Sequence, residues 1–238
     1  MQKWPKHVPP APPELQRIHE DFMQHWLTVL PQRYGLVEKF NQLYPVRRAP
    51  AGFRRTLEVG AGLGEHLRYE VLTPEQEREY HALDVRPNLV EELRRRFPKV
   101  QALVGDCQTR LGFPDGHFDR ILAIHVLEHL ANLPAAIREM HRLCDKERGS
   151  FTVMIPCEGS LAYGLARRIS AQRIFEKRYR IPYREFISRE HLNQPREIME
   201  ELTPRFRVTH RAFYPFPVPL YFCNLLVGLT LAPRNGKG

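Results

Sequence analysis

The chain has 238 residues, of which 42% are hydrophobic and 26% are charged. This composition is that of an ordinary globular protein and excludes a disordered or fibrous one. Thirty-six lysines and arginines outnumber 27 carboxylates, which gives a formal net charge of +9. An anionic partner is therefore expected, although charge alone does not choose among phosphate, nucleic acid, acidic lipid and a carboxylate substrate.

Cysteine usage and the hydropathy pattern suggest a cellular location. No two of the four cysteines form a C-x-x-C pair, so neither a disulfide framework nor a cysteine zinc site is predicted. The first 13 residues contain five prolines and no apolar core, so no signal peptide is expected. Prolines interrupt the most apolar stretch, 212–233, which is then too short to span a membrane. We expect a cytoplasmic protein.

The N-terminal part of the chain has a helical pattern. Apolar residues recur at helical spacing between Glu14 and Tyr44, and Pro31 is expected to separate two helices. Residues 1–50 are predicted to form an N-terminal helical cap. A basic linker is predicted at Pro45 to Arg55.

Residues 51–238 are predicted to form a second domain of the α/β class. Short apolar runs alternate with amphipathic ones, which is the rhythm of βαβ units. Parallel strands are predicted at Thr56–Val59, Glu79–Leu83, Val100–Val104, Phe118–Ile124 and Ser150–Ile155. Helices are predicted at Leu89–Phe97 and Ala135–Leu143. The short connection between two last strands, Arg205–Phe213 and Asn224–Leu231, requires that they pair antiparallel.

Residues 157–202 are longer than a simple crossover and are strongly basic. Between Ala162 and Arg184 the sequence has seven lysines and arginines but a single carboxylate, Glu176. We predict a substrate-facing insertion in which Arg173 and Lys177 hold an anionic acceptor. A solvated helix face explains the same charges equally well.

A glycine-rich turn, Leu57-Glu-Val-Gly-Ala-Gly-Leu-Gly64, follows the first predicted strand. Glycines there permit a tight turn and close approach of a ligand, and the helix start that follows favours polar or anionic groups. The dinucleotide motif G-x-G-x-x-G is not matched, because the third glycine comes one residue early and Glu65 occupies the sixth position. NAD and FAD are therefore disfavoured, and the Walker pattern is absent too.

Carboxylates end the next two predicted strands. Asp84 ends the second strand, where it can accept both hydroxyl protons of a ribose. Asp106, followed by Cys107, ends the third strand, where a carboxylate can accept from the amino group of adenine. Each aspartate alone is explained equally by a turn or a helix cap. The three strand ends together indicate a cofactor that contains adenosine.

These residues resemble the class I S-adenosylmethionine-dependent methyltransferases, specifically the type-11 methyltransferase domain family. The resemblance runs from about Arg54 to Pro156 and rests on the glycine turn, on Leu83-Asp84, on Val104-Gly105-Asp106 and on Phe113 to Leu130. It implies a Rossmann-like sheet of seven strands, mostly parallel with a C-terminal antiparallel strand, and helices on both faces. It also implies S-adenosylmethionine as the cofactor.

The same resemblance implies roles for individual residues. Around the methionine part it places Glu58, Gly60, Ala61, Gly62 and Gly64. It places Asp84 and Val85 at the ribose, Asp106 and Cys107 at the adenine, and Ile124 and His125 on the substrate side.

A competing motif lies in the same stretch. His125-Val-Leu-Glu-His129 matches H-x-x-E-H, which supplies two zinc ligands and a general base in inverzincin peptidases. Here it follows a strand in a βαβ series and has no evident third ligand downstream, so no metal is predicted. Hydrolysis by a Ser-His-Asp triad is disfavoured too, because no G-x-S-x-G elbow is present.

Methyl transfer from a sulfonium chiefly requires that the nucleophile is aligned and water excluded. A hydroxyl acceptor also needs a general base, for which His125 is the first candidate. His66, Glu128 and His129 are further candidates, and a structural role for His125 is equally open.

Aromatic residues between Tyr214 and Cys223 suggest the nature of the acceptor. This loop follows a strand end and is expected to overhang the site, so that Tyr214, Phe216 and Tyr221 form an apolar wall. Packing beneath the N-terminal helices explains these aromatics equally. Together with the basic insertion, they favour O-methylation of a small or amphiphilic anionic acceptor of the lipid, polyketide or glycan type.

Two alternative functions are also consistent with the sequence. The charge suggests an RNA methyltransferase, but no separate RNA-binding module is evident. From another class, the chain would be a catalytically inactive cofactor-binding partner or a membrane-docking protein. The oligomeric state is not predicted.

Overall fold

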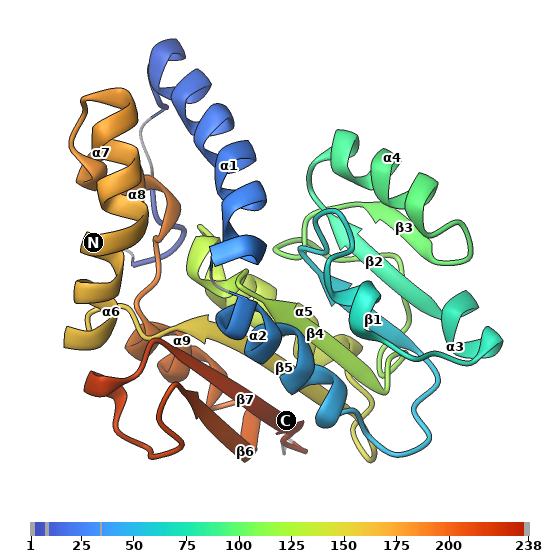
Figure 1. The fold of residues 1–238 in the computed structure, drawn as a ribbon. Coiled ribbons are helices and arrows are strands. Elements are labelled where there is room, and N and C mark those ends of the chain that lie inside the picture. Colours follow the sequence, from blue (N-terminus) through green and yellow to red (C-terminus); the bar gives the residue numbers. More distant parts are fainter. Residues whose placement is uncertain (1–2, 8–9, 34, 236–238) are drawn as a thin grey trace.

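One mixed sheet is the centre of the computed structural model, which describes residues 3–7, 10–33 and 35–235 (Figure 1). Its strand order is β3-β2-β1-β4-β5-β7-β6. The strands are β1 (Thr56–Val59), β2 (Tyr80–Asp84), β3 (Gln101–Val104), β4 (Arg120–Ile124), β5 (Ser150–Pro156), β6 (Phe206–Tyr214) and β7 (Leu226–Pro233). β1 to β5 are parallel, and β7 is antiparallel to both β5 and β6. The predicted Rossmann-like sheet is confirmed.

Helices cover both faces of the sheet. Because successive strand residues point to opposite faces, Leu57 and Val59 of β1 lie in one apolar cluster, with α5 (Leu133–Leu143) and α9 (Pro195–Leu202). Tyr80 and Ala82 of β2 belong to a second cluster, with α4 (Pro87–Arg96). The short helix α3 (Pro74–Arg78) precedes β2. The burial of both faces explains why the strands read as nearly continuous apolar runs.

Two helices, α1 (Pro13–Arg33) and α2 (Gly35–Arg47), precede the sheet. Pro31 lies within α1 and Pro45 within α2, so the predicted break at Pro31 and the predicted start of the linker at Pro45 are wrong. Each proline lies two residues before the end of its helix, so the helix ends soon after the hydrogen bond that the proline cannot donate. Pro45 is also buried, and its carbonyl accepts a hydrogen bond from Arg120.

Other predicted boundaries shift by a few residues. α4 and α5 begin earlier than expected, with Pro87 and Pro134 at their first turns, where proline is well tolerated. Phe118 makes only an isolated bridge, with Cys144, and β4 begins at Arg120. Asn224 lies before β7 rather than in it, because its side chain binds the preceding loop.

The basic insertion forms a helical arm that packs against α1. α6 (Leu161–Arg167), a π-helical turn (Arg168–Gln172) and α7 (Arg173–Tyr179) follow without interruption, and α8 (Tyr183–Glu190) folds back. Phe22 of α1 makes edge-to-face contacts with Phe175 of α7 (5.1 Å) and Phe186 of α8 (5.2 Å). Figure 1 shows α1 standing beside α7 and α8, above the sheet.

A buried charged network joins α2 to the sheet. The carboxylate of Glu70 contacts both Arg120 (Oε1 to Nη2, 2.5 Å) and His66 (Oε1 to Nε2, 2.6 Å), and the other ring nitrogen of His66 faces Gln42. His66 is therefore engaged here and not at the strand ends. Within the part of the chain that the structure describes, no helix is long and apolar enough to cross a membrane.

Candidate active site

Two positions of the glycine turn after β1 strongly favour glycine. Gly60 has a φ of +67°, and a Cβ there would lie 2.4 Å from Cγ2 of Val126. Gly62 has a φ of +57°, and its backbone N–H donates to Oδ2 of Asp84 (3.0 Å). The turn therefore places open backbone directly beside the end of β2.

Asp84 is a buried, ionised carboxylate. Burial opposes its ionisation, but the hydrogen bonds and charge of Arg86 and the N–H of Gly62 hold the pKa of Asp84 below its usual value. Arg86 contacts both oxygens, Nε to Oδ1 at 2.9 Å and Nη2 to Oδ2 at 3.1 Å. A ribose that binds Asp84 must displace this exposed guanidinium.

The ends of β2 and β3 supply apolar surface and a second carboxylate. Val85 and Val104 are exposed beyond Asp84. Asp106 accepts hydrogen bonds from the backbone and side chain of Gln108. Cys107 is buried, and burial raises the pKa of its thiol to about 12, so it acts as a neutral packing group.

Three further residues that were predicted to bind the cofactor are less accessible to solvent. The carboxylate of Glu58 is buried in β1 and accepts from the hydroxyl of Tyr80 (2.8 Å), and burial raises its pKa. Ala61 is buried, and its N–H donates to the carbonyl of Leu83. Ile124 ends β4 and is partly buried.

Beyond β4 the chain turns sharply at His125, a non-glycine residue with a φ of +55°. Nδ1 of His125 lies 3.0 Å from Oε1 of Glu128, which belongs to a short 3-10 turn (Leu127–His129). The Glu128 side chain is 2% exposed, whereas that of His125 is 31% exposed. Burial opposes ionisation of Glu128, but the hydrogen bond and charge of His125 keep its pKa low. Oε2 of Glu128 is buried with no hydrogen-bond partner.

A second carboxylate cluster, which the sequence reasoning missed, lies beyond β5. Glu158 contacts His191 (Oε2 to Nδ1, 2.7 Å) and Arg167 (Oε1 to Nη1, 3.3 Å). Its backbone carbonyl accepts from the hydroxyl of Tyr221 (2.7 Å). Burial disfavours the charged imidazole, but Glu158 more than offsets this and raises the pKa of His191. No local motif signals the cluster, because its members come from the turn after β5, from α6 and from the residue after α8.

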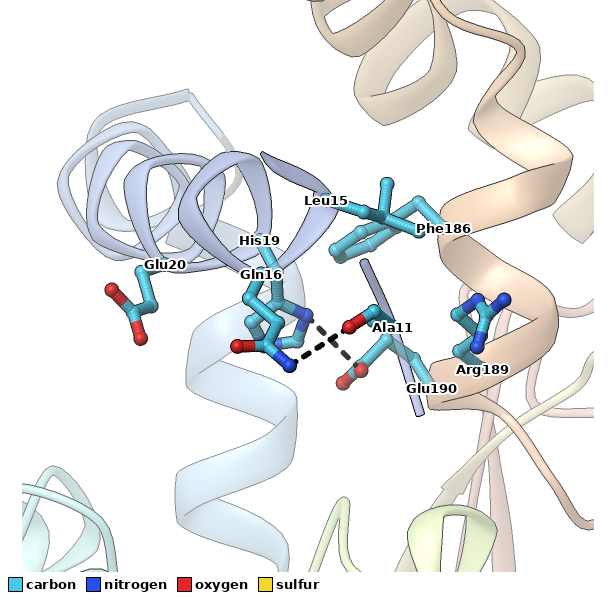
Figure 2. A pocket seen from close by; sticks show the side chains of 8 residues that line it. All are labelled: Ala11, Leu15, Gln16, His19, Glu20, Phe186, Arg189 and Glu190. Carbon is cyan, nitrogen blue, oxygen red and sulfur yellow. Dashed lines mark hydrogen bonds and ion pairs between the residues drawn. The ribbon is translucent and has the colours of Figure 1, made fainter. Parts of the chain in front are cut away.

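A cavity of about 220 Å³ lies between α1 and α8 (Figure 2). It is lined by Ala11, Leu15, Gln16, His19, Glu20, Phe186, Arg189 and Glu190. His19 contacts Glu190 across it (Nδ1 to Oε1, 3.2 Å), and the carbonyl of Glu190 accepts from His129. The charge of Glu190 also reaches Arg86, whose pKa is raised first by Asp84 and then by Glu190.

The five residues predicted for the acceptor do not come together. Arg173 and Lys177 are exposed on α7. Tyr214 packs on Phe40 of α2 (5.3 Å between rings), and Phe216 is exposed. Tyr221 alone of the five contacts the chain beyond β5, at Glu158.

The histidines of the H-x-x-E-H stretch face different partners. His125 contacts Glu128, and His129 contacts the carbonyl of Glu190. Within the described ranges, no three His, Cys, Asp or Glu side chains are arranged to hold a metal ion.

The fold and the strand-end residues have the arrangement of a class I methyltransferase domain. A glycine cradle beside an ionised carboxylate at the end of β2, with apolar surface next to it, fits an adenosine-bearing cofactor. Residues 57–152 match the family model of the methyltransferase domain. They form a class I S-adenosylmethionine-dependent methyltransferase domain, and the predicted family and cofactor are confirmed.

Relatives and solved structures agree with this class. The chain is 33% identical over 109 residues to a malonyl-[acyl-carrier protein] O-methyltransferase of Halorhodospira halophila. That match covers 44% of this chain and 35% of the relative, so the chain spans about a third of the relative's length.

The fold is similar to two S-adenosylmethionine-dependent methyltransferases of known structure. The TehB-like protein of Corynebacterium glutamicum has a TM-score of 0.59 at 15% identity, over 91% of this chain and 98% of that one. The protein of Thermotoga maritima has a TM-score of 0.60 at 19% identity, over 92% and 99%.

Proposed function

We propose that the protein methylates an oxygen atom of a small or amphiphilic acceptor, with His125 as the general base. The observation that carries this proposal is the pair of His125 and the buried carboxylate of Glu128 at the end of β4. His125 follows β4, which pairs with β1, and the glycine turn follows β1. We expect the methyl group to be delivered on this side of the turn. S-adenosylmethionine supplies that methyl group on a sulfonium, which is already activated for displacement.

Residues of the chain bind the cofactor, orient the acceptor and take a proton from it. Asp84 and Asp106 hold the ribose and the adenine, and the glycine turn receives the methionine part. His125 takes the proton of the acceptor hydroxyl while the new oxygen–carbon bond forms. Glu128 fixes the orientation of the imidazole through the contact between Nδ1 and Oε1. The α1 helix lies over this side and limits access of water.

Arg167 is the basic residue best placed for an anionic part of the acceptor. It reaches Glu158 beyond β5, and its Nε is buried with no hydrogen-bond partner. Arg173 and Lys177, which the sequence suggested, are instead exposed on α7.

The name of the Halorhodospira relative, an O-methyltransferase, supports oxygen as the acceptor atom. The four free thiols support a reducing, cytoplasmic location.

The test measures formation of S-adenosylhomocysteine by the full chain with hydroxyl- and carboxyl-bearing amphiphiles and with RNA. We expect turnover with an amphiphile, and turnover that is lower by at least about 100-fold for His125→Ala. His117→Ala, which changes a histidine before β4, is the matched control and retains turnover. Transfer to RNA, or full activity of His125→Ala, would contradict the proposal. Cofactor binding without turnover on any acceptor would instead favour an inactive binding protein.

A further inference from the structure

Two segments expose large apolar side chains to solvent. One is the helical arm around α6, and the other is the loop between β6 and β7. Their exposed fractions range from 41% to 79% for Leu161, Leu165, Ile169, Phe216, Val218, Leu220 and Phe222. Monomeric proteins rarely leave so many large apolar groups together in water without a partner.

The two segments form one surface. α6 contacts the 3-10 turn Tyr221–Cys223 of the loop. The hydroxyl of Ser160, which caps α6, donates to the carbonyl of Asn224 (2.9 Å), and Tyr221 donates to the carbonyl of Glu158. We call this surface the apolar patch. It lies at the carboxyl end of β5, because Leu226 of β7 pairs with Pro156.

The loop is held in shape by a single buried side chain. Oδ1 of Asn224 accepts from the N–H of Phe216 (2.8 Å), and its Nδ2 donates to the carbonyls of Leu220 (2.8 Å) and Val218 (3.2 Å). Asn224 is fully buried. The polar backbone of the loop is therefore satisfied inside while its apolar side chains face solvent.

The helical arm that carries part of the apolar patch is strongly basic. The arm carries seven lysines and arginines between residues 161 and 184 and a single carboxylate, Glu176. Glu176 is engaged by Gln172 and by the N–H of Tyr183. Arg168, Arg173 and Lys177 are exposed, and residues 214–223 contain no charged side chain.

We propose that the apolar patch docks on the surface of an anionic lipid bilayer. The apolar side chains enter the headgroup region, and Arg168, Arg173 and Lys177 face the lipid phosphates. Exposed apolar groups flanked by cations are the two elements that interfacial binding needs. A second copy of this chain is a poor occupant, because two basic surfaces would be brought together. The proposal does not depend on the acceptor.

The experiment is co-sedimentation of the full chain with vesicles of phosphatidylcholine alone or mixed with phosphatidylglycerol. We expect binding to the mixed vesicles that weakens as salt is raised, and little binding to phosphatidylcholine alone. Phe216→Ser with Phe222→Ser, and separately Arg173→Glu with Lys177→Glu, should each lower the bound fraction at limiting lipid at least about tenfold.

Matched controls change similar residues elsewhere. Val71→Ser removes an apolar side chain that is 93% exposed, and Arg138→Glu reverses a charge on α5; both should bind as the native chain does. Calorimetry with S-adenosylhomocysteine checks that every variant is folded, and this readout is independent of vesicle binding. The proposal is overturned if the native chain ignores anionic vesicles, if patch and control variants behave alike, or if the patch variants convert a dimer into a monomer.

Discussion

The imidazole of His125 and the carboxylate of Glu128 are 3.0 Å apart, on a turn whose backbone would be unfavourable for most residues. The left-handed φ of His125 brings its ring toward the short turn that carries Glu128. Strained backbone of this kind persists where the surrounding structure enforces it and is frequent at active sites. Here the N–H of His125 is held by the carbonyl of Met154 on β5.

For this pair, His125→Ala should lower kcat by about 10²-fold to 10⁴-fold, the usual contribution of a general base. Glu128→Gln should lower kcat more than it raises KM, because Glu128 acts through His125. Steady-state kinetics measure both effects. An unchanged kcat in Glu128→Gln would reduce this residue to a packing role.

Asp84→Asn and Arg86→Ala should change cofactor affinity in opposite directions. Asp84→Asn removes the charged acceptor for the ribose, a loss of about 1.5 to 3 kcal/mol, or roughly 10-fold to 150-fold in Kd. Arg86→Ala removes the group that competes for the same oxygens, so binding should tighten by a few-fold. Calorimetric titration with S-adenosylhomocysteine measures both. Weaker binding in Arg86→Ala would mean that the arginine contacts the cofactor.

Glu70 should contribute to stability in a pH-dependent way. Burial opposes its ionisation, but His66 and Arg120 more than compensate and lower its pKa to about 2. Because this value is below the ordinary 4.5, the contribution is present above about pH 4.5 and is lost as the pH falls toward 2. Glu70→Gln should therefore cost roughly 3 kcal/mol of unfolding free energy at pH 7 and much less near pH 2.

Glu92 provides the matched control for Glu70. Its pKa is also lowered to about 2, by Arg95 and Arg96, but these partners are exposed and solvent screens the pairs. Glu92→Gln should leave the unfolding free energy nearly unchanged. Urea unfolding at several pH values compares the two variants, and equal effects would show that the buried network carries no special stability.

The contact of His19 with Glu190 should make α1 sensitive to pH. The hydrogen bond and charge of Glu190 raise the pKa of His19 above 6.5, against the effect of burial. The charged link is therefore complete below pH 6.5 and is lost as the pH rises through the raised pKa. The hydrogen-exchange protection of the backbone of residues 14–22 should therefore fall between pH 6 and pH 8.5.

His19→Gln should abolish this pH dependence of α1, whereas His210→Gln, on β6, should retain it. Protection is compared after correction for intrinsic exchange rates. If both variants lose protection with pH as the native chain does, another group holds α1.

The fold was largely predictable because each strand is a short segment whose apolar pattern can be recognised from its own sequence. Ile121, Leu122 and Ala123 of β4 are all buried, and a buried parallel strand shows itself as a continuous apolar run. The glycine turn and Asp84 follow from the same pattern, since they come directly after strands. The ends of α1 and α2 were not predictable, because the sequence does not show that each helix continues two residues past its proline. Pro45 is held there by tertiary packing, since it is buried and its carbonyl accepts from Arg120.

The acceptor side was less predictable because it depends on packing between distant segments. Glu158 and His191 meet although 33 positions separate them, and nothing in either local sequence specifies the other. Arg86 follows Asp84 by two residues, yet the sequence does not show that it covers both carboxylate oxygens. The basic insertion was recognised, but the structure alone places Arg167 inward and Arg173 outward on it.

The loop around Asn224 has a consequence for the energetics of docking. Segments that fold on contact lose conformational entropy at that moment, and their affinity is reduced accordingly. This loop already has its backbone hydrogen bonds, so it loses that entropy during folding of the protein instead. Its association with a surface should then be a rigid-body event. The affinity should depend on the apolar area that is buried, and a folding equilibrium of the loop should not contribute to it.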